Sequence, residues 1–178
     1  MKKKDMDEMN EETIVQWQNS YSVGIKLVDE QHMKLINFTN RLFQNCLEGR
    51  EQSTSVFPET IHEAVDYVGY HFGTEEKIME RVNYPAFSTH KQEHAEFVRE
   101  VYSRAKEFNS GNKINTPLAF VYFLRDWVFH HIAVSDKKLG DYIAAMRNSG
   151  ELPQVILKDK KNEAVSSINI RKDFGVPA

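Results

Sequence analysis

Cysteine is almost absent from this chain, since Cys46 is the only one among 178 residues. A single thiol cannot form a disulfide within the chain, so internal cross-links are excluded, and the composition fits a reducing compartment. We interpret Cys46 as a small apolar residue of the first long helix.

Long uncharged runs and an excess of positive charge are missing as well. No uncharged stretch is long enough to cross a bilayer, and the start "MKKKDMDEMNEE" lacks the apolar core of a secretory signal. The net charge of −3 argues against an extended surface for nucleic acid, which needs clustered lysine and arginine. We therefore expect a soluble, cytoplasmic protein that binds neither nucleic acid nor membrane.

Strand-like alternation is lacking before residue 151, and apolar residues recur instead at helical spacing. Four long stretches show this period, at about 29–47, 58–81, 88–108 and 117–146. The connections between them are short, which favours antiparallel neighbours. The sequence therefore predicts an all-α fold, an antiparallel up-down-up-down four-helix bundle.

Residues with special backbone or capping preferences set the expected helix boundaries. Asp29 is predicted to cap the first helix, and Pro58 to stand in the first turn of the second. Ser88 or Thr89 is expected to cap the third helix. Gly140 is expected to weaken or bend the fourth helix, which should end near Gly150.

The chain is predicted to form one helical domain with an appendage at each end. Residues 1–12 are charged and aperiodic, so we expect a loose arm. Residues 13–150 form the domain, in which 13–28 are expected to be an irregular segment packed across the bundle. Residues 151–178 lack a helical period, which predicts a solvated or loosely docked tail. The alternative is a tail that docks on a protein partner.

Five of the seven histidines, together with two carboxylates, fall into one pattern along the four predicted helices. These residues are His32, His71, Glu75, His90, His94, His131 and Asp136. Two of the pairs have a four-residue spacing, which places both side chains on one helical face about 6 Å apart. We interpret the pattern as one buried pair of metal ions with ligands from all four helices.

The spacing of His131 and Asp136 is less regular than that of the other pairs. Five residues correspond to a rotation of about 140° between the two side chains in an ideal helix. Either Asp136 approaches the metal pair from another direction, or the turn widens into a π-type bulge.

The ligand types favour reversible binding over oxidation chemistry. Ferritin-like di-iron oxidases use two Glu-x-x-His pairs, and this chain has one, Glu59 with His62. Imidazole suits iron, zinc, copper and nickel, and a carboxylate can bridge two cations through its two oxygens.

Four segments of the chain resemble the hemerythrin family, and bacterial single-domain hemerythrin (bacteriohemerythrin) in particular. They read "W…YSVGIKLVDEQH", "HFGTEEKIM", "YPAFSTHKQEH" and "W…HHIAVSD", and the resemblance covers about residues 13–146. It implies two iron ions joined by an oxo or hydroxo group, with dioxygen as the ligand. By position, one iron would be held by His90, His94 and His131, the other by His32 and His71, with Glu75 and Asp136 bridging them.

Apolar residues one helical turn from the ligands share their inward face. We expect Leu35, Ile78, Phe97 and Val128 to line an oxygen pocket. Family members often have leucine in place of Val128, so the smaller side chain is expected to open this pocket and speed autoxidation.

The resemblance implies reversible dioxygen binding for storage, delivery or scavenging, without catalytic residues of the protein. Two alternatives stay open. One is an oxygen or redox sensor that acts through a partner, and the other is a di-iron redox enzyme such as a nitric oxide or peroxide reductase.

Overall fold

The described part of the protein, residues 13–48, 50–109 and 117–153 of a computed structural model, consists of helices and their connections and contains no strand. Its elements in chain order are η1 (Asn19–Tyr21), α1 (Lys26–Leu47), α2 (Arg50–Arg81), α3 (Phe87–Asn109), α4 (Pro117–His130), the π-helical η2 (His131–Asp136) and α5 (Lys137–Ser149). None of the described helices has the length and apolar character needed to cross a membrane. The arm predicted for residues 1–12 and most of the predicted tail lie outside the described residues.

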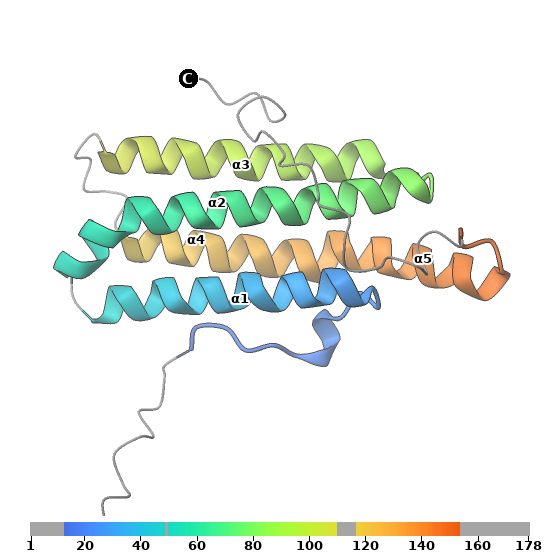
Figure 1. The fold of residues 1–178 in the computed structure, drawn as a ribbon, viewed down its shortest axis with the longest axis horizontal. Coiled ribbons are helices and arrows are strands. Elements are labelled where there is room, and N and C mark those ends of the chain that lie inside the picture. Colours follow the sequence, from blue (N-terminus) through green and yellow to red (C-terminus); the bar gives the residue numbers. More distant parts are fainter. Residues whose placement is uncertain (1–12, 49, 110–116, 154–178) are drawn as a thin grey trace, which may run out of the picture.

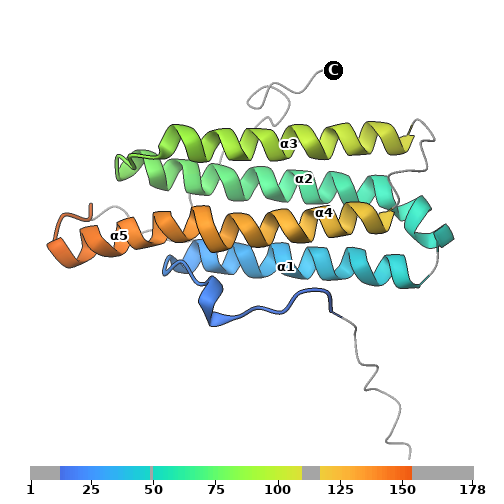
Figure 2. The same ribbon diagram turned by 180° about the vertical axis from the view of Figure 1, so that it is seen from behind.

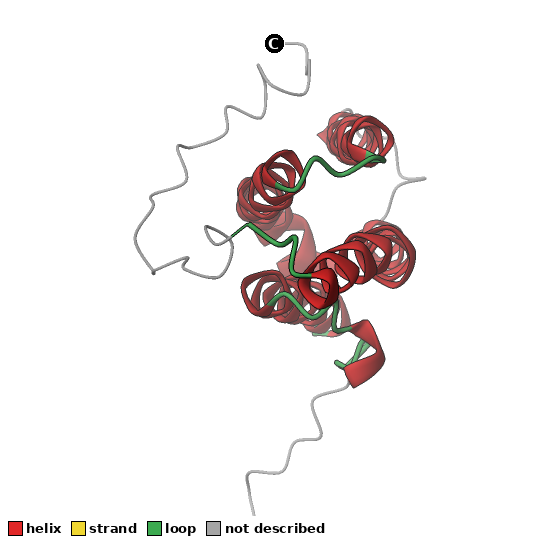
Figure 3. Cartoon of the chain, turned by 90° about the vertical axis from the view of Figure 1, so that its right-hand side faces the viewer, coloured by secondary structure: helices red, strands yellow, loops and turns green. Residues whose placement is uncertain are grey.

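The long helices form the antiparallel bundle predicted from the sequence (Figure 1). Helix α1 packs against α2 and α4, and α2 packs against α3. Helices α4, η2 and α5 follow one another as a single rod that extends beyond the other helices (Figure 2). The end-on view shows that the four rods surround a common interior (Figure 3).

The segment before α1 runs along the outside of the bundle and is fixed by side chains of α1 (Figure 1). Asn40 receives a hydrogen bond from the backbone N–H of Val15 and donates one to its carbonyl. Asp29 accepts hydrogen bonds from the Val23 N–H and the Ser22 hydroxyl. The prediction that Asp29 caps α1 was therefore wrong, because its carboxylate holds the preceding chain and α1 begins at Lys26.

Two further predicted helix starts were displaced. Helix α2 begins at Arg50, so Pro58 lies inside it rather than in its first turn. Proline lacks the backbone N–H of a regular helical turn, and α2 bends near its start in Figure 1. Helix α3 begins at Phe87, and therefore neither Ser88 nor Thr89 is its cap.

Gly140 of α5 allows the backbone near Val23 to approach the helix closely. A Cβ atom at this position would lie 2.2 Å from the carbonyl oxygen of Val23. Gly150 ends α5 as expected, with φ of 78°, a left-handed conformation that favours glycine.

Two apolar clusters lie on either side of the predicted ligand residues along the bundle axis. The larger one includes Leu35, Phe72, Phe97 and Val128. The smaller one includes Val28, Ile78, Met79 and Leu139, and lies toward the α5 end of the bundle. A polar layer therefore separates two parts of the apolar core.

Candidate metal centre

The polar layer consists of the seven predicted ligands, and all seven are buried. None of their exposed fractions is above 3%. One comes from α1, two from α2, two from α3 and two from the rod of α4 and η2, in the order His32, His71, Glu75, His90, His94, His131, Asp136. Burial of so many ionisable groups is costly unless they are paired or bind a metal.

These side chains divide into two overlapping groups, and each group offers ligand atoms that lie within 4.8 Å of one another. One group is Glu75 with His90, His94 and His131, and the other is His32, His71, Glu75 and Asp136. In the first, the Nε2 atoms of His94 and His131 are only 3.0 Å apart. Each group thus matches the donor set of one metal ion, with imidazole nitrogen and carboxylate oxygen as donors.

The two carboxylates lie between the groups and turn one oxygen toward each. Glu75 Oε2 is 3.2 Å from Nε2 of His94, and Glu75 Oε1 is 3.7 Å from Nε2 of His71. Asp136 Oδ1 is 3.1 Å from Nε2 of His131, and Asp136 Oδ2 is 3.1 Å from Nε2 of His32. This is the arrangement by which two carboxylates bridge two cations.

Many polar atoms of the layer have no hydrogen-bond partner within the described residues. They are both oxygens of Glu75, both oxygens of Asp136, both nitrogens of His32 and Nε2 of His90. A buried polar group without a partner is unfavourable by about 1 to 3 kcal/mol. Metal ligation would satisfy all of them except Nδ1 of His32, so the residues present fit a pair of metal ions.

The outer nitrogen of His71 is held by an amide. Nδ1 of His71 lies 3.1 Å from Oε1 of Gln31, whose Nε2 donates to the Thr74 hydroxyl at 3.1 Å. That hydroxyl in turn donates to the carbonyl of Tyr70. Since the amide nitrogen of Gln31 is the donor to Thr74, its oxygen accepts from Nδ1–H of His71. The Nε2 lone pair of His71 therefore points into the layer.

The outer nitrogen of His94 is held by a carboxylate. Nδ1 of His94 lies 3.3 Å from Oε1 of Glu76, and the Lys91 ammonium donates to Oε2 at 2.6 Å. Burial alone would raise the pKa of Glu76, but the hydrogen bonds and charges of His94 and Lys91 outweigh it and lower that pKa. Glu76 is therefore ionised at neutral pH and accepts the His94 hydrogen bond.

The outer nitrogen of His131 is also held by a carboxylate. Nδ1 of His131 lies 3.2 Å from Oε2 of Glu93, which also accepts a hydrogen bond from Ser135 at 2.5 Å. The hydrogen bond with His131 is the main reason that the pKa of Glu93 is lowered to about 2. The Glu93 side chain is 40% exposed, whereas the His131 side chain is 4% exposed.

The carboxylates set the protonation of the metal-free histidines. Burial acts to lower the pKa of His90, but the carboxylates of Asp136 and Glu75, whose oxygens lie 3.2 and 3.4 Å from its Nε2, raise that pKa to about 10. The same opposition raises the pKa of His32 to about 9. Burial prevails at His71, where the pKa falls to about 4.

The turn between α4 and α5 places two ligands and an outer partner in the layer. His131 and Asp136 are the first and last residues of the π-helical segment η2, and Ser135 lies between them. A π turn has a wider turn than an α-helix, so residues five apart approach the same face. Of the two alternatives for Asp136, the structure therefore shows the π-type turn.

Aromatic rings cover the histidines of the three-histidine group. The Phe72 ring stacks on His94 with centroids 3.7 Å apart, and the indole of Trp127 stacks on His131 at 4.4 Å. Trp127 also stacks on Phe97 at 3.9 Å. These contacts fix the imidazole planes and keep water from them.

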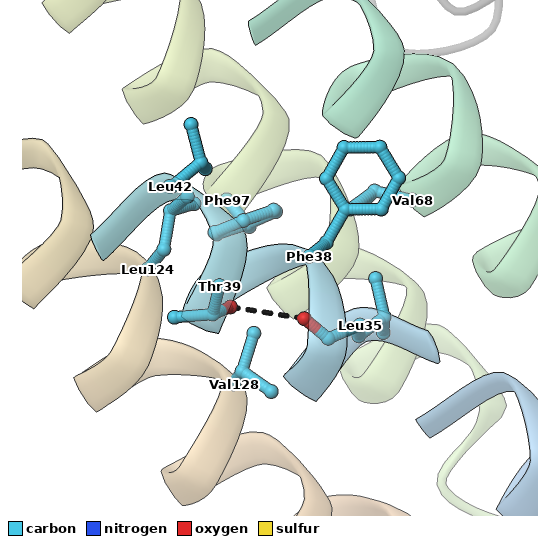
Figure 4. A pocket seen from close by; sticks show the side chains of 8 residues that line it. All are labelled: Leu35, Phe38, Thr39, Leu42, Val68, Phe97, Leu124 and Val128. Carbon is cyan, nitrogen blue, oxygen red and sulfur yellow. Dashed lines mark hydrogen bonds between the residues drawn. The ribbon is translucent and has the colours of Figure 1, made fainter. Parts of the chain in front are cut away.

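A small apolar cavity lies one helical turn from the layer. Its volume is about 20 Å³. Its lining residues are Leu35, Phe38, Thr39, Leu42, Val68, Phe97, Leu124 and Val128 (Figure 4). Of the four residues predicted for an oxygen pocket, three line this cavity. Ile78 does not, because it packs in the smaller cluster on the other side of the layer.

The sequence reasoning missed the outer partners Gln31, Glu76, Glu93 and Ser135. The only sequence signal that could have found the two carboxylates is that each is next to a predicted ligand: Glu76 follows Glu75, and Glu93 precedes His94. Adjacency does not show which histidine each carboxylate reaches, because these contacts join different helices. His130, the neighbour of the predicted ligand His131, is exposed, and the side chain of His62 lies outside the described residues.

Comparison with known proteins gives one family for this architecture. Residues 23–143 match the family model described as the hemerythrin HHE cation binding domain. A bacteriohemerythrin of Stenotrophomonas maltophilia is 33% identical over 74% of this chain and 83% of its own. A bacteriohemerythrin of Pseudomonas aeruginosa is 31% identical over 89% of this chain and 97% of its own.

Solved structures show the same relationship. A wild-type hemerythrin crystal structure superposes with a TM-score of 0.62 at 26% identity, covering 72% of this chain and 96% of that chain.

Proposed function

The chain belongs to the hemerythrin family of di-iron oxygen-binding proteins, and from that premise we propose that it binds dioxygen reversibly at a di-iron site. The observation that carries the proposal is the position of Glu75 and Asp136 between the two histidine groups. Each carboxylate has one oxygen near the first group and the other oxygen near the second. A pair of irons bound there would supply the electrons and the binding position that dioxygen needs.

The seven ligands would hold the irons unequally. His90, His94 and His131 are three imidazole donors for one iron, whereas His32 and His71 are two for the other. The position with only His32 and His71 as imidazole donors would leave room for an exogenous ligand, and we propose dioxygen as that ligand.

The apolar surroundings would exclude water from the ligand. The cavity beside the layer is lined almost entirely by apolar side chains, and the only hydroxyl among them, on Thr39, donates to the Leu35 carbonyl (Figure 4). A space of about 20 Å³ suits a small neutral molecule, and its lining offers little to hold an ordered water. Dioxygen would therefore enter more readily than solvated ions.

We propose binding rather than turnover. The carboxylates Glu75, Asp136 and Glu93 face the metal positions or an outer histidine nitrogen, so none of the three is free to act as an acid or base toward a bound substrate. Proton delivery to a bound substrate would need such a group.

An optical titration tests this function. The iron-loaded protein is reduced under anaerobic conditions, exposed to oxygen and then deoxygenated. A visible charge-transfer band that appears with oxygen and disappears on its removal is the expected result. Direct conversion to a stable oxidised form, with no reversible band, would contradict the proposal and favour a redox enzyme or redox sensor.

A further inference from the structure

The groups that accept the Nδ1–H hydrogen bonds differ in charge between the two histidine groups. In the three-histidine group, His94 and His131 each give Nδ1–H to a carboxylate, Glu76 and Glu93. In the two-histidine group, His71 gives Nδ1–H to the neutral amide of Gln31. Nδ1 of His32, the other member, has no hydrogen-bond partner within the described residues.

Both carboxylates are anchored by a second donor on their own side of the site. Glu76 accepts from His94 through Oε1 and from Lys91 through Oε2. Glu93 accepts from His131 and from Ser135, which belongs to the same π turn as His131. The anchors fix the carboxylates where they hold the imidazole planes and the tautomer.

The charge behind an imidazole changes its strength as a ligand. A carboxylate that accepts Nδ1–H draws the proton toward itself and leaves more negative charge on Nε2, which makes Nε2 a better donor to a metal. A neutral amide that accepts Nδ1–H leaves less negative charge on Nε2. The three-histidine group, in which two imidazoles donate Nδ1–H to carboxylates, should therefore stabilise a higher metal charge than the two-histidine group.

We propose that Glu76 and Glu93 are positioning residues that make the two metal positions unequal. Through His94 and His131, they strengthen metal binding at the three-histidine position and favour the ferric over the ferrous state of its iron. The inference rests on the ligand set of the proposed function and is independent of dioxygen binding.

Glutamine variants test the charge while keeping the shape and an acceptor oxygen. The experiment compares Glu76→Gln and Glu93→Gln with the control Glu96→Gln, an exposed residue of α3 bonded to Gln92. Stepwise ferrous-iron affinities are measured anaerobically against a competing chelator, and midpoint potentials are measured on the iron-loaded proteins.

We expect the tighter of the two binding steps to weaken by about 10- to 100-fold in Glu76→Gln and in Glu93→Gln. The weaker step should stay unchanged within about threefold, because the other ligands keep their partners. The midpoint potential should rise, since the ferric state loses stabilisation. Glu96→Gln should match the parent protein in all three quantities.

Two results would overturn the proposal. One is agreement of both variants with Glu96→Gln in affinities and potentials. The other is an equal weakening of both steps, which would indicate a general structural role. Gln31→Glu adds a carboxylate behind His71 and should lower the midpoint potential, a shift that a structural role does not predict. A parent protein that binds two irons but no oxygen would refute the proposed function and leave this inference standing.

Discussion

Val128 is one of the side chains that limit the cavity beside the polar layer. Val128 lies one turn before His131 and lines the cavity with Leu35 and Phe97. Leucine, which has one more methylene, would fill much of a space of about 20 Å³, whereas alanine would enlarge it.

Val128→Leu is expected to slow autoxidation of the oxygenated protein, because less room remains for water. Val128→Ala should have the opposite effect and lower the free energy of unfolding by about 2 kcal/mol. The decay of the oxygenated absorption band gives the rate, and denaturant titration gives the stability. Equal decay rates in both variants and the parent would remove Val128 from the control of autoxidation.

Two neighbouring histidines provide a sharp test of the ligand assignment. His131 is buried in the polar layer, whereas the side chain of His130 is exposed on the same helical rod. His131→Ala should reduce the iron content from two ions per chain toward one and destabilise the bundle, because buried partners lose their charge balance. His130→Ala is the matched control and should retain full iron. Unchanged iron in His131→Ala would refute the assignment.

At the scale of the element, the helices and their inward residues were predictable, but the contacts between helices were not. The apolar period and the four-residue ligand spacings follow from geometry within one helix, so the bundle could be predicted. The actual role of Asp29 depends on a segment that turns back onto α1, and the reach of Glu93 depends on the packing of α3 against the π turn. The π turn could be named only as one of two alternatives, since a five-residue spacing permits both.

Gly140 illustrates how packing overrides helix preference in α5. Alanine should favour a helix by about 1 kcal/mol over glycine, yet its Cβ would lie 2.2 Å from the Val23 carbonyl oxygen. Because that contact is with backbone, the N-terminal segment would have to move. Gly140→Ala is therefore expected to lower the free energy of unfolding by about 2 kcal/mol.

Asp141→Ala, at an exposed position in the same helix, is the control for helix propensity. Its thermal midpoint should stay close to that of the parent or rise slightly. A stabilised Gly140→Ala variant, measured by thermal unfolding of the same preparations, would show that the segment yields without cost.

At the scale of the whole molecule, pH should act in opposite directions on the metal-free fold and on metal binding. The pKa values of His32, His90 and His131 are raised to about 9, 10 and 9. Groups with raised pKa stabilise the folded state below their unfolded value, and this contribution is lost as pH rises through the folded value. The stability of the metal-free protein should therefore fall between about pH 6.5 and pH 10.

Metal binding should strengthen over the same range, because these imidazoles must lose their protons to bind. Zinc affinity, measured against a competing chelator at each pH, is expected to keep rising up to about pH 10, the pKa of His90. An ordinary histidine site would level off near pH 6.5. An affinity that is constant above pH 7 would contradict the protonation described for the metal-free site.

The polar layer between the two apolar clusters also bears on how the chain selects its native alignment during folding. Sliding any one helix by a turn, about 5.4 Å, would push an imidazole or a carboxylate into one of the clusters. Helices whose inward faces were entirely apolar could shift between such alignments at little cost in free energy. Here every shifted arrangement carries an unsolvated charge, so a collapsed chain can reach only one alignment of its four helices without penalty.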